Sequence, residues 1–321
     1  MRNPSKIKNH LIVSIANIWV YVWFARVVMR HIRTCGEIPN PANPKTVNDK
    51  FLWRKVFDHN PDFVGLSDKL ECKQIAKDKC KDIVLPKVLW VGGDASDIPV
   101  EHLQGDVIVK ATHGSGFCFP VFGGKYDREA LLAETKGWLN TRYGRTHWEW
   151  GYFGLKPRLY VEELILDENG GYGTAEAKVY VYCGKIELIT MIYDRHLGSA
   201  AAILHGDWTP STIANQIGAK SADRPLPSNR QAIEEVALQL CDGLDHMRCD
   251  LYLVGSKIFF GEYTVYNQGG YLMLDDDAML RDAQSASWDI RQSWFLSNPQ
   301  SGLRAIYAGA VLDILDGAET T

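Results

Sequence analysis

The chain has 321 residues, of which 46% are hydrophobic and 23% are charged, so it can bury a large core in one multi-lobed unit or two domains. Its formal net charge of -4 provides no broad attraction for nucleic acid, which we do not expect as a partner. The seven cysteines form no C-x-x-C pair, which argues against a zinc site or a disulfide framework. Reduced thiols and a cytoplasmic location are therefore expected.

The first 35 residues are predicted to form an apolar and basic N-terminal helix. The run 11–25 is almost entirely apolar and is flanked by Lys6, Lys8, Arg26, Arg30 and Arg33. A spanning helix needs about 20 apolar residues, and extending this run would include Arg26. Three alternatives stay open: a helix packed on the domain or on a second subunit of a homo-oligomer, a helix lying peripherally at the inner face of the membrane, and a true span.

The rest of the sequence mixes helical and strand patterns without regular βαβ alternation. A connector with three prolines covers 36–44, and it breaks any helix there. Apolar spacing predicts helices at 47–57, 67–81, 128–143 and 230–244, with Ser67 as the cap of the second. Strands are predicted at 85–91, 107–110, 117–122, 158–166, 177–182, 186–193, 250–254 and 257–263. This order favours the α+β class over a doubly wound parallel sheet.

The stretch VIVKATHGSG (107–116) places a lysine at the end of an apolar strand, directly before a glycine-rich turn. Gly114 and Gly116 allow the backbone around Ser115 to fold closely, so that successive N–H groups can meet an anion. Together with Lys110, this arrangement suggests a phosphate site. The alternative is a tight hairpin turn with Lys110 reaching solvent.

Two adjacent glutamates interrupt the apolar strand RLYVEELIL (158–166). Neighbours in a strand point to opposite faces, so either Glu162 or Glu163 must face inward. A buried carboxylate needs a donor, for which an adenine amine is one candidate, and the backbone of Glu163 and Ile165 could read a purine edge. The alternative is an edge strand with both glutamates solvated or paired with Arg158.

The segment AEAKVYVYCGKIEL (175–188) has the pattern of a hairpin in which Lys178 shares one face with Glu176. Such a lysine could face a phosphoryl or acyl-phosphate group. The alternative is a solvated hairpin face with a cross-strand ion pair.

A later hairpin, MRCDLYLVGSKIFFGEYT (247–264), brings two carboxylates, Asp250 and Glu262, towards each other. Like charges approach only around a cation, and hard oxygen ligands favour Mg²⁺. Thr264 or Asn267 could add a neutral oxygen, and Arg248 could meet a developing negative charge. The alternative is a surface hairpin in which Arg248 neutralises Asp250.

The order of these pieces from Asn43 to Gly270 resembles the ATP-grasp superfamily of carboxylate ligases. It is most similar to the TupA-like branch, which is associated with teichuronopeptide and surface-polysaccharide biosynthesis. The matching segments are PKTVNDKFLWRKVFDHNP, SDKLECKQIAKDK, VIVKATHGSG, WEWGYFGLKPRLYVEELI, AKVYVYCGKIELI and MRCDLYLVGSKIFFGEYT. The implied fold has two α+β lobes that grip ATP. The implied divisions are an N-terminal helix at 1–35, a helical region at 36–105, a lid at 106–165 and a core at 166–321.

The resemblance also implies roles for individual residues. Lys69 and Lys110 would contact ATP phosphates beneath the loop Gly114–Ser115–Gly116, and Glu162, with the backbone of Glu163 and Ile165, would hold adenine. The remaining implied roles are Lys178 facing the transferred phosphate, Arg248 steadying the intermediate, and Asp250 and Glu262 binding Mg²⁺. Many ATP-grasp enzymes have Asn two positions after the metal glutamate, where this chain has Thr264, so the number of metal ions stays open.

The implied activity is an ATP- and Mg²⁺-dependent carboxylate–amine ligase that works through an acyl phosphate. The alternatives are a kinase for a small molecule or sugar and a catalytically silent nucleotide-binding module. Glycosyl transfer is disfavoured, because the one D-x-D run, at 275–277, lies in an apparently exposed loop. Loop residues beside the proposed chemistry are candidates for substrate selection: His147, Trp148, Trp150, Tyr152, Asp194, Arg195, His196, Tyr266, Asn267 and Gln268.

Overall fold

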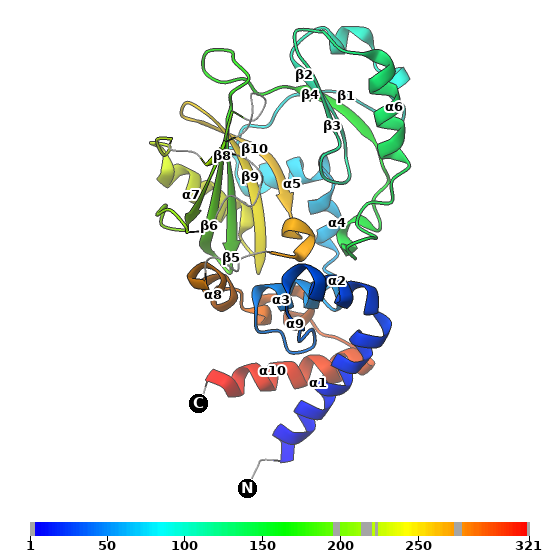
Figure 1. Cartoon of the computed structure of the whole chain (residues 1–321), viewed down its shortest axis with the longest axis vertical. Helices are drawn as coiled ribbons and strands as arrows, with labels where there is room; N and C mark the ends of the chain where they lie inside the picture. The colour runs from blue at the N-terminus through cyan, green and yellow to red at the C-terminus, as the bar shows by residue number, and fades with distance from the viewer. Residues whose placement is uncertain (1–3, 195–199, 213–219, 222–223, 273–277, 320–321) are drawn as a thin grey trace.

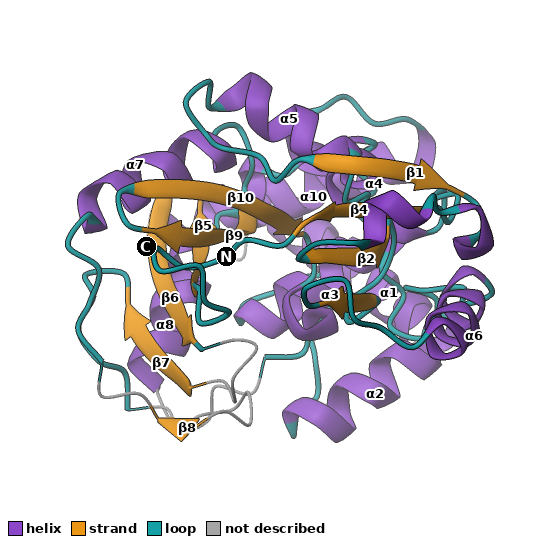
Figure 2. Cartoon of the chain, turned by 90° about the horizontal axis from the view of Figure 1, so that it is seen from above, coloured by secondary structure: helices purple, strands orange, loops and turns teal. Residues whose placement is uncertain are grey.

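Two β-sheets and a layer of helices make up the computed structural model of the chain, which describes residues 4–194, 200–212, 220–221, 224–272 and 278–319. The smaller sheet has the strand order β1-β4-β2-β3, and the larger has the order β10-β9-β5-β6-β7-β8. Figures 1 and 2 show the two sheets side by side, with the N-terminal and C-terminal helices gathered at the end of the molecule farthest from the smaller sheet.

The larger sheet is mostly antiparallel, and only β7 and β8 pair in parallel. Its strands are β5 (Ala175–Tyr182), β6 (Lys185–Tyr193), β7 (Ala200–His205), β8 (Lys220–Ser221), β9 (His246–Val254) and β10 (Lys257–Thr264). Alternate residues such as Val179, Cys249 and Leu251 are fully buried against α4 (Asp62–Ser67), α5 (Glu71–Lys79) and α7 (Arg230–Cys241). The intervening residues of β5 and β9 therefore face the other side of the sheet.

The smaller sheet consists of β1 (Val88–Gly92), β2 (Val107–Ala111), β3 (Cys118–Val121) and β4 (Leu159–Glu163). Helix α6 (Arg128–Leu139) covers one face and buries Leu131 and Trp138 against it. Asp127 starts this helix by accepting hydrogen bonds from the backbone of Glu129 and Ala130. Because β1 pairs with β4, the sheet begins before residue 106, where the sequence predicted the lid to start.

The helical layer joins segments from both ends of the chain. It contains α1 (Pro4–Trp23), α2 (Ala25–Cys35), α3 (Val47–Val56), α8 (Ala278–Ser287), α9 (Trp294–Ser297) and α10 (Gly302–Glu319). Thr46 and Asp49 form a capping box that starts α3. The indole of Trp53 then donates to the Tyr307 hydroxyl at 2.9 Å, which fastens α3 to α10.

The short 3-10 helices are Ala95–Asp97, Val100–Leu103, Trp150–Tyr152, Asn267–Gly270 and Ile290–Gln292. In the part of the chain that the structure describes, no single helix combines the length and apolarity needed to cross a membrane. Lys6–Trp23 and Ala25–Cys35, which meet at 92°, satisfy that requirement only as a bent pair.

One predicted helix differs from the structure at its start. Ser67 is the last residue of α4 and does not cap the next helix, which begins at Glu71. Asp68 takes that role, because its carboxylate accepts hydrogen bonds from the backbone of Leu70 and Glu71. This break leaves Lys69 in a turn between two helices, where its side chain can reach the sheets.

Candidate active site

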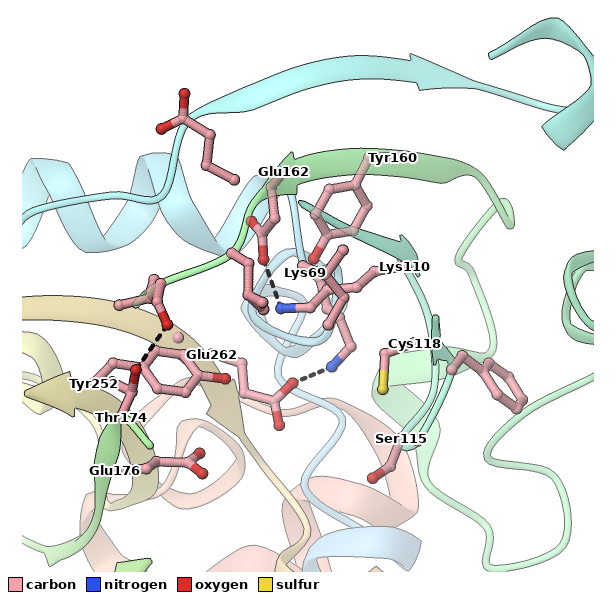
Figure 3. Close-up of a pocket in the computed structure, with 17 residues that line it drawn as sticks. Lys69, Lys110, Ser115, Cys118, Tyr160, Glu162, Thr174, Glu176, Tyr252 and Glu262 are labelled. Carbon is pink, nitrogen blue, oxygen red and sulfur yellow. Dashed lines mark hydrogen bonds and ion pairs between the residues drawn. The ribbon is translucent and has the colours of Figure 1, made fainter. Parts of the chain in front are cut away.

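A pocket lies between the facing sides of the two sheets, and residues far apart in the sequence line it (Figure 3). The smaller sheet contributes β2, β4 and the turn before β3, and the larger contributes β5, β9 and β10. The lining residues are Lys69, Ile108, Lys110, Ser115, Gly116, Phe117, Cys118, Tyr160, Glu162, Glu163, Leu164, Ile165, Thr174, Glu176, Tyr252, Gly261 and Glu262. The predicted site residues 69, 110, 115, 116, 162, 163, 165 and 262 are thus brought together.

The glycine-rich turn between β2 and β3 has the backbone conformation that its sequence predicts. Gly114 and Gly116 have φ angles of 79° and 77°, which lie in the left-handed region that favours glycine. A Cβ on Gly114 would meet the rings of Phe117 and Tyr143 at 2.8 Å, so a side chain is excluded there. Ser115 and Gly116 line the pocket, and Gly114 does not.

Glu162 and Glu163 point to opposite sides of β4, as predicted. The Glu162 side chain is 2% exposed and lies 2.5 Å from Nζ of Lys110 and 3.0 Å from Nζ of Lys73. Glu163 points outward, 3.8 Å from Lys87. The predicted alternative partner, Arg158, binds Asp68 instead. Lysines rather than Arg158 therefore neutralise the inward carboxylate.

These lysines decide the ionisation of Glu162. Burial alone would raise the pKa of Glu162, but Lys110 and Lys73 outweigh it and lower that pKa. Glu162 in turn raises the pKa of Lys110 against the effect of burial. Sequence analysis missed Lys73, because a lysine in the lysine-rich helix α5 has the pattern of a solvated helix face. Its position four residues after Lys69, within the helix predicted at 67–81, was the available signal, because that spacing places two residues on one helix face. In the structure Lys69 lies in the turn before α5, and Lys73 reaches Glu162 without lining the pocket.

The pocket side of the larger sheet carries a second charged row. Strand pairing places Lys178 opposite Asp250, and Tyr180 opposite Arg248. Lys178 contacts both Asp250 and Glu176, the latter at 2.7 Å. Arg248 holds Asp250 through Nε at 2.6 Å and Nη2 at 2.8 Å. Burial raises the pKa of Asp250, but Arg248 and Lys178 outweigh it, and the pKa falls to about 2.

Glu262 owes its direction to a β-bulge. Phe260 pairs with Leu251, and Glu262 pairs with Asp250, so Gly261 is the extra residue of β10. Without the bulge, Glu262 would share the core-facing side of Phe260, which is 0% exposed. A Cβ on Gly261 would come within 2.9 Å of the Asp250 carbonyl. Glycine therefore allows Glu262 to turn from the core to the pocket.

Glu262 and Asp250 form the cross-strand pair that the sequence predicted. Glu262 contacts Lys69 and lies 3.7 Å from Nη2 of Arg248. Burial raises the pKa of Glu262, but Lys69 is the main cause that lowers it. Arg248 does neutralise Asp250, as the alternative interpretation held, but it does so beside the pocket. The pair thus lies among three cations, Lys69, Lys178 and Arg248.

Two carboxylates on neighbouring strands fit one Mg²⁺, which usually takes one or two carboxylates and completes its shell with phosphate and water. Within the residues described, no group of three or more His, Cys, Asp or Glu side chains could hold a metal. Asp250 and Glu262 alone would therefore be incomplete ligands, and phosphate oxygens would have to supply the rest.

Two further residues, Thr264 and Asn267, were predicted to add a neutral oxygen to this metal. Thr264 pairs with Arg248 across the strands and does not line the pocket. The amide of Asn267 is 2.9 Å from Nε2 of His246, whose Nδ1 faces the Val181 carbonyl at 2.9 Å. Asn267 is 0% exposed, and its amide nitrogen donates into this buried contact, which leaves its Oδ1 without a hydrogen-bond partner among the described residues. Its role as a metal ligand therefore stays a prediction.

Several residues suggested for substrate selection make packing contacts. Trp150 stacks on His59, Tyr152 packs on Tyr143, and His147 packs on Tyr271. Asp194 binds Arg224 near the surface. Arg195, His196 and the D-x-D run at 275–277 lie outside the described residues. Sequence analysis also missed apolar residues of the pocket, Ile108, Leu164 and Tyr252, whose strand patterns are typical of an ordinary core.

Comparison with solved structures finds ATP-grasp enzymes at low similarity. D-alanine–D-alanine ligase from Bacillus anthracis, complexed with ATP, is 15% identical, with a TM-score of 0.41 and coverage of 79% of this chain and 68% of that one. L-amino acid ligase from Bacillus licheniformis is 12% identical, with a TM-score of 0.40 and coverage of 75% and 51%. The ATP-grasp ligase PsnB with its minimal precursor is 14% identical, with a TM-score of 0.39 and coverage of 73% and 64%.

No curated protein matches the chain. The sequence profile of the family described as TupA-like ATPgrasp matches residues 49–281. That span begins in α3, contains both sheets and the whole pocket, and ends in α8. The chain is therefore a member of the TupA-like ATP-grasp family and has the ATP-grasp fold.

Proposed function

We propose that the protein is an ATP- and Mg²⁺-dependent carboxylate–amine ligase. One observation supports this most: Lys69 and Lys110, from one side of the pocket, face carboxylates that two other segments bring to it. Both lysines are held by carboxylates of the protein itself. Bound ATP and its metal could replace these internal ion pairs, because the phosphates would attract the lysines and the metal would attract the carboxylates.

In this proposal ATP lies along the pocket with its adenine beneath β4. Ile108, Leu164 and Tyr252 supply apolar surface for the ring, and Glu162 with the backbone of Glu163 and Ile165 would read its edge. The Ile165 carbonyl accepts a hydrogen bond from the Thr174 hydroxyl at 2.7 Å, and a carbonyl oxygen can accept a second one.

The phosphates would follow towards β10. Lys69 and Lys110 would bind them from the side of the smaller sheet, and the turn at Gly114–Gly116 would cover them. Asp250 and Glu262 would hold the Mg²⁺ that neutralises phosphate charge. Lys178 and Arg248 would face the negative charge that develops on the transferred group.

The chemistry then proceeds in two balanced steps. An oxygen of the substrate carboxylate attacks the γ-phosphorus, ADP leaves, and an acyl phosphate forms. An amine attacks its carbonyl carbon, inorganic phosphate leaves, and the amine proton is lost as the amide forms. These steps require positioning and charge neutralisation from the protein but no covalent nucleophile. The closed turn would also keep water from the acyl phosphate.

We further propose that the acceptor is an amino acid or peptide amine and that the carboxylate belongs to a polysaccharide-type or small-molecule acid such as a uronic acid. This narrower proposal depends on the association of the TupA-like branch with teichuronopeptide and surface-polysaccharide biosynthesis. It is an analogy at the level of the family.

The test is product analysis by mass spectrometry after incubation with ATP, Mg²⁺ and a panel of amino acids and uronic acids. A ligase yields an amide together with ADP and free phosphate. A stable phosphorylated product would identify a kinase instead. Mg²⁺-dependent nucleotide binding without any turnover across the panel would favour a silent binding module and count against the ligase.

A further inference from the structure

Helix α1 exposes a continuous apolar stripe along its whole length. Residues spaced by three or four positions share one side of a helix, and Ile7, Leu11, Ile15, Ile18 and Val22 follow this spacing. All five are between 56% and 65% exposed. A soluble protein seldom leaves so long an apolar row in water without a partner for it.

The opposite side of α1 already has its partner within the chain. Val13 and Val20 are 4% and 0% exposed, and Val13 packs in the cluster that includes Val311 of α10. Asn9 donates to Asp313 of α10 at 2.7 Å. Because these contacts fix the rotation of α1, the exposed stripe cannot turn inward without breaking them.

Charge distinguishes the surface around this stripe from the rest of the chain. The first 35 residues contain Arg2, Lys6, Lys8, Arg26, Arg30 and Arg33 but no aspartate or glutamate, although the whole chain has a net charge of -4. The neighbouring helix α10 carries three acidic residues, Asp313, Asp316 and Glu319, of which Asp316 is bound by Arg291 at 3.3 Å. The segment is therefore a basic surface on an acidic protein.

The stripe and the cations meet where α1 turns into α2, at the 92° bend that Figure 1 shows at the end of α1 farther from the N-terminus. A hollow at this corner is lined by residues of α1, α2 and the loop after α6, among them Val22, Trp23, Arg26, Arg30, Arg145 and Trp148. A second hollow along α2 adds Met29 and Arg33. Guanidinium groups beside apolar side chains suit a phosphate attached to an acyl chain.

We propose that the α1–α2 surface docks on an anionic lipid membrane, with α1 lying along the interface. The stripe would enter the boundary between headgroups and acyl chains, and Arg26, Arg30 and Arg33 would meet lipid phosphates. Trp19 and Trp23, which are 43% and 74% exposed, are the residue type enriched at that depth.

A second copy of the chain fits the same surface less well. In a twofold dimer the same patch faces itself, so the cations of α1 and α2 would face cations of the other copy, because neither helix contains an acidic residue. An anionic membrane neutralises these charges. This inference is independent of the proposed ligase activity, because it uses neither the pocket nor its residues.

The test is sedimentation of the full chain with vesicles of phosphatidylcholine alone and with added phosphatidylglycerol. We expect binding to the anionic vesicles that weakens with salt and that falls by about tenfold or more in Arg26→Glu/Arg33→Glu, since each cation near such a surface contributes measurably. Ile18→Ser/Val22→Ser should weaken binding by a similar factor through loss of apolar burial.

The matched control is Lys125→Glu/Lys136→Glu, which makes the same charge change at exposed positions of the smaller-sheet lobe and should bind like the wild type. Circular dichroism would verify that each variant is folded. Equal binding to neutral and anionic vesicles, or loss of binding in the control to the same extent, would overturn the proposal. So would the absence of vesicle binding combined with a concentration-dependent dimer that Ile18→Ser/Val22→Ser abolishes.

Discussion

The charges of the pocket and the cations of α3 in the helical layer are both largely withdrawn from water, but they differ in the partners they hold. In the pocket, Lys69 and Lys110 bind carboxylate side chains that line the same space. In the helical layer, Arg54 donates to the His246 and Val265 carbonyls, both at 3.1 Å, and to Asp245 at 2.7 Å.

The two lysines of α3 follow the same rule as Arg54. Lys50 donates to the Ser285 and Trp288 carbonyls, both at 2.5 Å, and Lys55 donates to the Gly269 carbonyl. Backbone carbonyls are fixed by the fold, whereas a carboxylate beside a pocket can exchange its partner. Burial of a charge alone therefore does not indicate function; what matters is whether a ligand could replace its partner.

The largest effect on stability should come from removing one of the α3 cations with fixed partners, Arg54, Lys50 and Lys55 (the fixed set). Arg54→Met would leave Asp58, Asp245 and two carbonyls without their donor, and we expect the free energy of unfolding to fall by about 3–5 kcal/mol. Urea denaturation measures this loss. The control is Arg224→Met, which removes an ion pair with Asp194 whose arginine is 53% exposed; there we expect about 1 kcal/mol or less. Equal losses in the two variants would contradict the distinction.

Removing one of the pocket lysines, Lys69 or Lys110, should weaken ATP binding more than it lowers stability. Lys110→Met should weaken ATP binding by about 1.5–3 kcal/mol, the range for a hydrogen bond to a charged group. Its cost in stability should be smaller than that of Arg54→Met, because Lys73 still neutralises Glu162. Titration with ATP, alongside urea denaturation, separates the two effects. A large loss of stability with unchanged ATP affinity would assign Lys110 to the fixed set.

Lys73→Met should lower ATP affinity less than Lys110→Met does. Lys73 and Lys110 share Glu162, so Glu162 should hold Lys110 more strongly once Lys73 is lost. We expect ATP affinity to fall by about tenfold, which corresponds to about 1.4 kcal/mol. The same titration measures it, and an effect as large as that of Lys110→Met would mean that Lys73 contacts ATP directly.

A further effect is one of pH and concerns Glu149, which is buried near Lys55. Burial raises the pKa of Glu149 from 4.5 to about 7, and Lys55 opposes this only in part. The folded protein then keeps a proton that the unfolded chain releases, so the free energy of unfolding should fall as pH rises from 4.5 to about 7. Glu149→Gln should flatten that slope in urea denaturation. An unchanged slope would show that other groups cause it.

Much of the pocket was predictable because it depends on residues that are close together in the sequence. Strand alternation alone separates Glu162 from Glu163, and hairpin pairing alone brings Asp250 and Glu262 within one residue of facing each other. The bulge at Gly261 that turns Glu262 to the pocket was not predicted, although a glycine inside a strand is a known signal for one.

What escaped prediction depends on contacts between distant segments. Asn267 stands near Glu262 in the sequence, yet His246 takes its amide. The role of the last helices was not predicted, because Trp288, Phe295 and Tyr307 form a core only by packing with α3, which is far away in the sequence. The turn that frees Lys69 was missed because Ser67 has the pattern of a helix cap, whereas it ends the preceding helix.

The most direct test of the account is calorimetric titration of ATP with and without Mg²⁺ into the wild type, Glu262→Gln and the exposed control Glu101→Gln. We expect Mg²⁺ to strengthen ATP binding in the wild type and the control, and we expect this strengthening to be lost in Glu262→Gln while the protein stays folded. Equal ATP affinity with and without Mg²⁺ in the wild type, or full Mg²⁺ dependence retained in Glu262→Gln, would contradict it.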